Sequence, residues 1–236
     1  MTSLRLKDRI ALITGASRGI GRAVVLALAR EGAHVLLLSR ARKALEEVDD
    51  RIRAQGGKAS LIPLDLADGK AIDTLGPTLY ERFGRLDVLV GNAAILGRLT
   101  PLTHIPSEHW ERTLAVNLTA YWRLIRTLDP LLRRSDAGRV IFVTSSGVAQ
   151  QGRAYWAPYS VSKAALECLA KTYANETSDS AIKVNLIDPG ATATGMRAEA
   201  YPGEDQSTLR TPEEVAESFI ALALPDWNET GRTVEA

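Results

Sequence analysis

The chain has 236 residues, 45% of them hydrophobic, and a formal net charge of +1 at pH 7. This length suits one α/β domain with a substantial core, which we expect to span residues 1–236. A charge near zero gives no reason to expect nucleic acid or an anionic membrane surface as a partner. The charged N-terminal residues are not followed by a long apolar run, so neither a secretory signal nor a spanning helix is expected.

The single cysteine bears on both the compartment and the core. A lone cysteine cannot form an internal disulfide, so the sequence favours a reducing, cytoplasmic location. Cys168 lies in a helical pattern, and we interpret it as a small core residue.

Residues 10–21 combine a strand, a glycine turn and the start of a helix. The aliphatic, β-branched run at 10–14 predicts a buried strand. Three glycines come next with the spacing Gly-x-x-x-Gly-x-Gly, at Gly15, Gly19 and Gly21. Such a turn lets the backbone approach a phosphate, and the first helical N–H groups point at the anion with the helix dipole behind them. Glycines also mark ordinary turns, so residues further along the chain must decide between a phosphate site and a simple turn.

Strands and helices alternate along the rest of the chain. Further buried strands are predicted at 34–39, 61–65, 86–91, 140–144 and 184–188. Helical patterns fill the intervals, as at Leu45, Val48 and Ile52 on one face of the second helix. Pro63 suggests that the third strand lies at a sheet edge. The alternation predicts an α/β fold, a single doubly wound, parallel, Rossmann-like sheet with helices on both faces.

Local signals place the starts of three later helices. Ser107 is a suitable N-cap for a long helix, and Pro158 suits the first turn of the next one. Residues 211–214 form a capping box with proline at the first helical position. The polar stretch at about 191–210 is expected to be a surface loop or lid next to the substrate. Residues 233–234 could add one short strand.

In a doubly wound sheet the ligand lies beyond the carboxyl ends of the strands, where the strand order reverses. The residues at those predicted ends are Gly15, Ser39, Asp65, Asn92, Ser145 and Pro189.

Tyr159 and Lys163 are four residues apart in a helical pattern, so their side chains share a face. Tyrosine is a poor acid or base at neutral pH, because its pKa is about 10. An ammonium at about 4 Å contributes roughly 4 kcal/mol at an effective dielectric constant of about 20, equal to up to about three pKa units. We therefore expect Lys163 to lower the pKa of Tyr159 until its phenolate is reached near neutrality, as proton exchange with a carbonyl or alcohol requires. The alternative is an ordinary surface pair.

Two further polar positions support chemistry at this helix. A serine hydroxyl after the strand at 140–144 could hold a substrate oxygen near the tyrosine. Counting from the strand favours Ser145, whereas counting back from Tyr159 favours Ser146. We choose Ser145, because a loop absorbs an extra residue more easily than a buried strand shifts its register. Asn117 lies in an apolar helical pattern, where a polar side chain needs a hydrogen-bond partner; the alternative is a locally satisfied core amide.

In this order, these residues resemble the short-chain dehydrogenase/reductase family, in its classical branch. The resemblance covers about residues 4–224. It is carried by Thr14–Gly21, Asn92–Ala94, Asn117, Ser145, Tyr159–Lys163 and Pro189–Gly190. The glycine motif and the Tyr-x-x-x-Lys pair are modest signals singly, but their order and separation together are specific.

The resemblance implies transfer of a hydride between a nicotinamide cofactor and a carbonyl or secondary alcohol carbon. By this likeness Tyr159 is the general acid/base, Lys163 lowers its pKa and bonds the nicotinamide ribose, and Ser145 polarises the substrate oxygen. Asn117 holds a water of a proton relay behind Lys163. The cofactor-binding residues that it implies are Gly15, Ser17, Arg18, Gly19, Ile20, Gly21, Ser39, Arg40, Asp65, Leu66, Asn92, Ala93, Tyr159, Lys163, Pro189, Gly190, Thr192 and Thr194. No metal site is expected.

The cofactor preference is predicted from charge. Enzymes that use NAD tend to place a carboxylate at the end of the second strand, where it bonds the ribose 2′-OH. Here that position is Ser39, followed by Arg40, with Arg18 in the glycine turn and Arg42 nearby. A 2′-phosphate would find guanidinium partners, so we expect a preference for NADP(H), with NAD(H) as the alternative.

The chain departs from the family pattern at three places. Gly91–Ala94 replaces the frequent Asn-Asn-Ala-Gly, and the serine-to-tyrosine segment is one residue longer if Ser145 is catalytic. The C-terminus lacks the usual last strand and its closing segment. A homodimer or homotetramer is implied by the resemblance, and this third departure weakens the case for a complete tetramer.

The leading hypothesis is thus an NADP(H)-dependent oxidoreductase acting on a small carbonyl or alcohol. The main alternative is a non-catalytic NAD(P)-binding redox sensor or scaffold on the same fold, which would not need Tyr159 and Lys163 together. The substrate pocket is expected to be lined by residues 95–106 and 192–210. Trp156 is expected either as an apolar wall of that pocket or as a packed aromatic.

Overall fold

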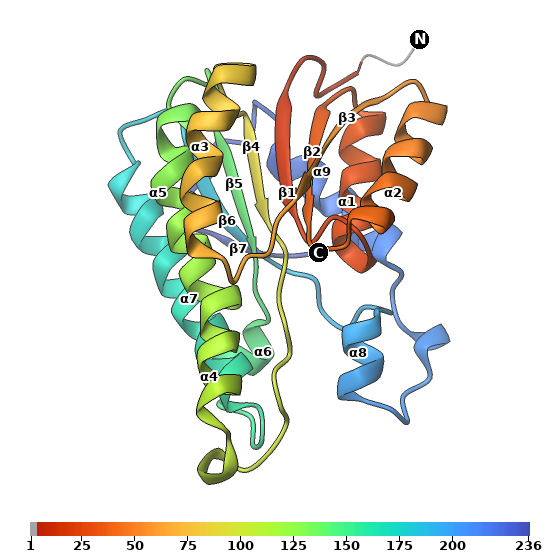
Figure 1. Ribbon diagram of the computed structural model, residues 1–236, viewed down its shortest axis with the longest axis vertical. Helices are drawn as coiled ribbons and strands as arrows, with labels where there is room; N and C mark the ends of the chain where they lie inside the picture. Colours follow the sequence, from red (N-terminus) through yellow and green to blue (C-terminus); the bar gives the residue numbers. More distant parts are fainter. Residues whose placement is uncertain (1–3) are drawn as a thin grey trace.

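The computed structural model describes residues 4–236 and contains a seven-stranded sheet between two layers of helices (Figure 1). All neighbouring strands are parallel, in the order β3-β2-β1-β4-β5-β6-β7. The strand order therefore reverses between β1 and β4, which is where a doubly wound sheet binds its ligand. The strands are β1 (Ile10–Thr14), β2 (His34–Ser39), β3 (Lys58–Pro63), β4 (Val88–Gly91), β5 (Arg139–Val143), β6 (Lys183–Asp188) and β7 (Thr233–Glu235).

Alternate residues of the strands supply two separate cores. In β1, Ile13 packs with one helix layer, whereas Leu12 packs with the other, as the two-residue period of a strand requires. The first layer is α1 (Gly19–Arg30), α2 (Arg42–Ala54) and α9 (Pro212–Ala223), and the second is α3 (Gly69–Phe83), α5 (Ala120–Leu132) and α7 (Ala157–Glu176) (Figure 1). The predicted doubly wound fold is confirmed.

One long helix is interrupted in the middle. α4 (Ser107–Leu114) continues through a π-helical turn, η2 (Ala115–Thr119), directly into α5. π-turns are rare and frequently occur at functional sites. The shorter elements are η1 (Leu102–His104), α6 (Ser146–Ala149), α8 (Gly195–Ala200) and η3 (Gln206–Thr208).

Several predicted boundaries were wrong. β3 begins at Lys58 and ends at Pro63, because it pairs along the whole of β2, from His34 to Ser39; its predicted edge position is confirmed. The segment expected to be a loop at about 191–210 contains α8 and η3. The C-terminus does form a last strand, since β7 pairs in parallel with β6.

Two side-chain predictions also need correction. Ser107 is the first helical residue of α4 rather than its cap, because Pro106 occupies the N-cap position. Cys168 is exposed rather than in the core, since α7 buries the face that carries Leu166 and Ala170 and Cys168 points away from it. The capping box of α9, between Thr211 and Glu214, is confirmed.

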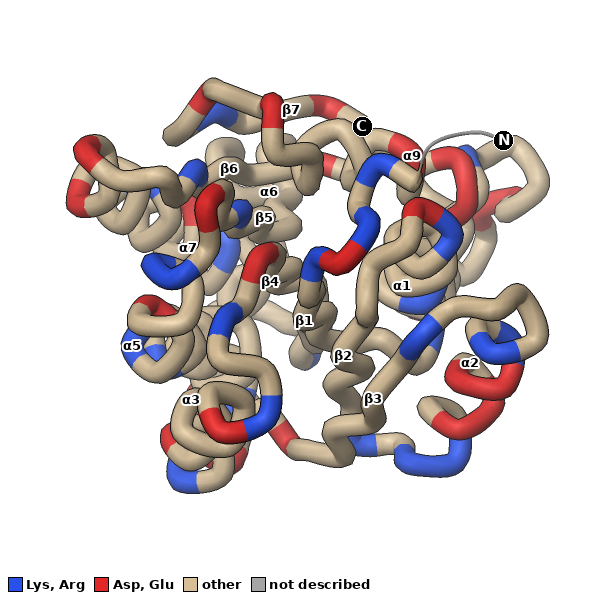
Figure 2. The backbone as a smooth tube through the Cα atoms, turned by 90° about the horizontal axis from the view of Figure 1, so that it is seen from above, with Lys and Arg blue, Asp and Glu red and all other residues tan. Residues whose placement is uncertain are grey.

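Figure 2 shows the sheet along a second direction, with charged residues mostly on the outer helices and the loops. In this view α2 and α3 each carry segments of both signs. Within residues 4–236, no helix combines the length and apolar character needed to cross a membrane.

Candidate active site

The glycine turn packs tightly between β1 and α1. Gly15 and Gly19 have φ angles of +69° and +54°, a region that side chains other than glycine seldom adopt. A Cβ atom at Gly21 would lie 2.2 Å from the carbonyl oxygen of Gly15, so α1 starts in direct contact with the turn. Arg18 occupies the N-cap position of α1. Within the described residues, its side chain makes no hydrogen bond to the first N–H groups of the helix. The first N–H groups of α1 are thus available to an anion.

Polar side chains from the ends of β2 and β3, and from α4, meet beside this turn. The Ser39 hydroxyl donates to the Ser17 hydroxyl at 2.9 Å, which ties β2 to the turn. The Arg40 guanidinium lies 3.6 Å from the Asp65 carboxylate, and Arg112 lies 3.7 Å from the same carboxylate. The second nearby arginine, Arg42, instead pairs with Glu46 along α2. Arg40, rather than Arg42, therefore belongs to this end of the site.

The residues after β4 are held by β1. The backbone N–H groups of Asn92 and Ala93 donate to the Thr14 hydroxyl at 2.9 and 3.0 Å. The Asn92 side-chain amide donates to the Thr14 carbonyl at 3.0 Å, and the buried Tyr121 hydroxyl donates to the Ala93 carbonyl. This network fixes the point where the strand order reverses.

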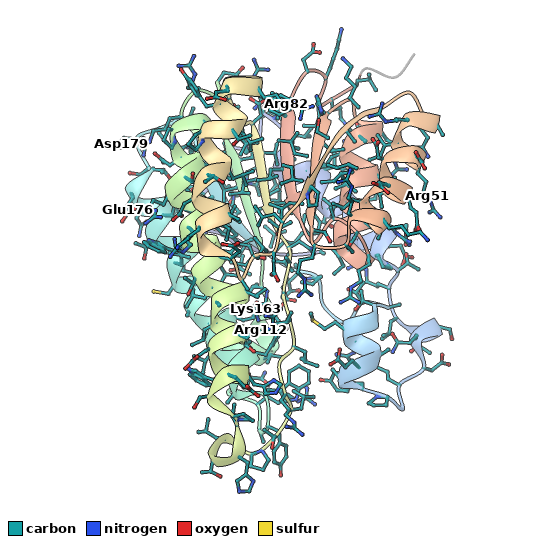
Figure 3. The ribbon with its side chains drawn as sticks, viewed as in Figure 1. Arg51, Arg82, Arg112, Lys163, Glu176 and Asp179 are labelled. Carbon is teal, nitrogen blue, oxygen red and sulfur yellow. The ribbon has the colours of Figure 1, made fainter. Side chains whose placement is uncertain are left out.

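Tyr159 and Lys163 both come from the start of α7 and line one cleft with Ser145. The Lys163 ammonium lies 5.7 Å from the centre of the Tyr159 ring and donates to the Val143 carbonyl at 2.7 Å. The two groups therefore face the same space, as their spacing predicts. Figure 3 shows Lys163 and Arg112 in the half of the molecule where α8 lies, whereas Arg82 lies at the opposite end of the sheet.

The predicted acidification of Tyr159 is not observed in the protein alone. Burial raises the pKa of Tyr159 to about 12, although a hydrogen bond with Ser145 acts to lower it. Burial also lowers the pKa of Lys163 to about 8, against the carboxylates of Asp188 and Glu167, which raise it. Desolvation is the largest cause of both shifts, and near neutral pH Tyr159 carries its proton.

Asn117 lies in the π-turn and joins two elements of the site. Its amide nitrogen donates to the Ile95 carbonyl at 2.9 Å and to the Ser162 hydroxyl at 3.1 Å, while its oxygen accepts from the Ile95 N–H at 2.9 Å. Both amide hydrogens are thus used within the protein. This geometry suits a positioning residue between the loop after β4 and α7, and the relay water stays a prediction.

Two carboxylates near Lys163 were missed in the sequence. Glu167 is buried one turn after Lys163 and accepts from the Thr144 hydroxyl at 2.6 Å; its signal is the repeated four-residue spacing from Tyr159. Asp188, at the end of β6, accepts from the N–H groups of Ser146 and Gly190 at 2.7 and 3.0 Å. Asp188 therefore links the segment after β5, which carries Ser145 and Ser146, to the loop after β6.

The two candidate serines have different surroundings. Ser145 lines the cleft and interacts with Tyr159. The Ser146 hydroxyl is buried and makes no hydrogen bond with the described residues, and Ser146 is not among the residues that line the cleft. The choice of Ser145 is supported by this placement.

The cleft has a volume of about 570 Å³ and runs from the ends of β2 and β3 to Tyr159. It brings together all the predicted cofactor-binding residues except Gly21, which lies beneath the turn. Of the predicted catalytic residues, only Asn117 does not line it. The stretch at 95–106 contributes only Ile95 and Leu96. The stretch at 192–210 contributes seven residues, namely Thr192, Thr194, Gly195, Met196, Arg197, Ala200 and Tyr201.

A glycine turn at the switch point of a parallel sheet, with a Tyr-x-x-x-Lys pair at the other end of the same cleft, defines a dinucleotide-binding oxidoreductase fold. Comparison with known proteins gives the family. The sequence profile described as short chain dehydrogenase matches residues 9–205, and the chain belongs to this family.

Related proteins are similar over almost their whole length. The uncharacterized oxidoreductase YciK of Escherichia coli K12 is 37% identical over 235 residues, covering 98% of this chain and 92% of YciK. A short chain dehydrogenase structure from Pseudomonas syringae is 40% identical, with a TM-score of 0.95 and coverage of 99% of this chain and 96% of that one. A short chain dehydrogenase structure from Escherichia coli CFT073, complexed with NADPH, is 37% identical, with a TM-score of 0.95 and coverage of 100% and 99%.

Proposed function

We propose that this protein is an NADP(H)-dependent carbonyl reductase, in which Tyr159 is the general acid/base. The observation that carries the proposal is that Ser145, Tyr159 and Lys163 meet in a cleft that also contains the glycine turn. The cradle fits a dinucleotide, because the turn leaves no room for side chains at Gly15 and Gly21 and aims the start of α1 into the cleft. When bound, the nicotinamide supplies the hydride to the carbonyl carbon.

The protein's own residues bind the substrate oxygen and supply the proton that it takes up. Ser145 and Tyr159 donate hydrogen bonds to the substrate oxygen, and the Tyr159 hydroxyl passes its proton to that oxygen as charge develops there. Lys163 then balances the negative charge left on the phenolate. Because its pKa of about 8 lies above neutrality, Lys163 is mainly protonated when this is needed.

The surroundings of Tyr159 suit proton donation. A tyrosine with a pKa of about 12 is protonated at neutral pH, which is the state from which it donates to an oxygen that gains charge during hydride transfer. The phenolic oxygen of Tyr159 takes the proton back when the reaction runs in the other direction.

The preference for NADPH should depend on Arg40. Arg40→Ala is expected to lower kcat/KM for NADPH roughly 10- to 100-fold, as removal of a charge-assisted hydrogen bond to the 2′-phosphate predicts, with little change for NADH. Arg42→Ala is the matched control, because Arg42 pairs with Glu46. Steady-state rates with both cofactors check this. A wild-type efficiency for NADH equal to that for NADPH would contradict the preference.

The catalytic serine can be assigned by a pair of substitutions. Ser145→Ala is expected to lower kcat about 10²–10³-fold, the usual cost of one donor to a developing oxyanion. Ser146→Ala should retain activity, since the contact to Asp188 uses the backbone N–H of Ser146. Steady-state rates of both variants test which serine is catalytic, and their NADPH affinities show whether each variant is folded. Loss of activity in Ser146→Ala alone would reverse the assignment.

The whole proposal is tested by following nicotinamide absorbance with a panel of aldehydes and ketones. NADPH binding without any turnover would favour the non-catalytic alternative. The single-domain extent 1–236, the cytoplasmic location and the homodimer or homotetramer stay predictions. Trp122 on α5 and Val161 on α7, both 44% exposed, are apolar side chains that an assembly could cover.

A further inference from the structure

The end of the cleft around Tyr159 is apolar. Leu96, Trp156 and Tyr159 form a cluster in which each side chain is at most 8% exposed. Half-buried apolar residues pack around it, namely Ala94, Leu99, Val148, Met196, Ala200 and Tyr201. Trp156 stands edge-on to Tyr159, with ring centres 6.0 Å apart, so it forms the wall beside the phenol.

The segment containing α8 closes against this wall. The Tyr201 ring lies 5.7 Å from that of Trp156. The exposed Arg153 places its guanidinium 5.2 and 5.1 Å from the centres of these two rings. Two aromatic side chains from distant parts of the chain thus enclose the space next to the acid/base.

Within the described part of the chain, Lys163 and Arg197 are the charged residues that line this end of the cleft. The charged residues that line the whole cleft are Arg18, Arg40, Asp65, Lys163 and Arg197. The first three belong to the end near the glycine turn, and Lys163 donates to Val143. Arg197 stacks 3.8 Å from the centre of the Tyr201 ring and gives both of its hydrogen bonds to the two oxygens of Glu204, at 2.5 Å each.

We propose that this part of the cleft takes uncharged, apolar carbonyl compounds, and that Glu204 excludes carboxylates by neutralising Arg197. This inference rests on the proposed function. A carboxylate entering the site would lose its hydration without compensation, which is costly. Arg197 is already paired with Glu204, Lys163 is buried, and Arg153 is not among the residues that line the cleft. A neutral ring or chain would be buried between Trp156 and Tyr201 without that loss.

The test compares 4-acetylbenzoate with its methyl ester, which share one aryl ketone and differ in charge. Binding to the protein loaded with NADP⁺, which cannot reduce the ketone, is measured by calorimetry at pH 7.5. We expect the ester to bind at least about 100-fold more tightly, because the carboxylate is not compensated in the site. Equal or tighter binding of the carboxylate would overturn the proposal.

Two variants test the role of the ion pair. Glu204→Gln should reduce the preference for the ester at least about 10-fold, because Arg197 is then free to pair with a carboxylate. Glu199→Gln removes an exposed carboxylate from α8, the helix that carries Arg197, and should leave the preference unchanged. An unaltered preference in Glu204→Gln would overturn the assignment of that residue.

Rates with NADPH separate this inference from the proposed function. Selective binding of the ester without its reduction would refute the reaction and leave the binding preference standing. Reduction of both ketones with equal kcat/KM would refute the preference and leave the reaction standing.

Discussion

Tyr159→Phe is expected to lower kcat/KM for carbonyl reduction about 10²–10⁴-fold, the usual contribution of a positioned general acid. The substitution removes one oxygen from a ring that packs against Trp156, so the wall of the cleft should persist. NADPH affinity should change much less, because most of the predicted cofactor contacts lie at the glycine turn and the strand ends.

The measurement is the steady-state rate of NADPH oxidation with one reactive ketone, together with NADPH binding to the same preparation. Tyr80→Phe provides a matched control, since it removes a phenolic hydroxyl from a half-exposed residue on α3. Undiminished turnover by Tyr159→Phe would remove the mechanism, whatever the identity of the substrate.

The parts of the fold that sequence predicts well are those set by local periodicity. Leu45, Val48 and Ile52 are the buried residues of α2, because one apolar stripe on a helix has one way to face a sheet. The bounds of β3 are less predictable, since its pairing with β2 selects which residues of an irregular apolar run enter the sheet.

In the site, too, sequence predicts the features that local spacing sets and misses those that tertiary contacts set. The four-residue spacing of Tyr159 and Lys163 correctly predicts a shared face, but not the balance of desolvation and attraction that sets their pKa values. That balance depends on burial by other elements and on a charge from one of them, Asp188 at the end of β6. In the same way, the pair of Arg197 with Glu204 depends on how the segment containing α8 folds back on itself.

Gly21→Ala should damage both the fold and the cofactor site. An added Cβ would lie 2.2 Å from the Gly15 carbonyl oxygen and 2.5 Å from the Asn92 side-chain nitrogen. Since one of these contacts is with backbone, α1 must move away from the turn. Overpacking of this kind costs about 1–3 kcal/mol, which corresponds to a fall in Tm of roughly 2–12 °C for a protein of this size.

The same displacement moves the first N–H groups of α1 from the phosphate site, so NADPH affinity should fall at least about 10-fold, as loss of charge-assisted hydrogen bonds predicts. Thermal unfolding and NADPH titration measure the two effects separately. Gly203→Ala is the matched control, because a Cβ there meets no atom within 4 Å. If Gly21→Ala bound NADPH as tightly as wild type, the close contact between turn and helix would not be what shapes the phosphate site, and its side chains, Ser17 and Arg18, would have to supply the binding instead.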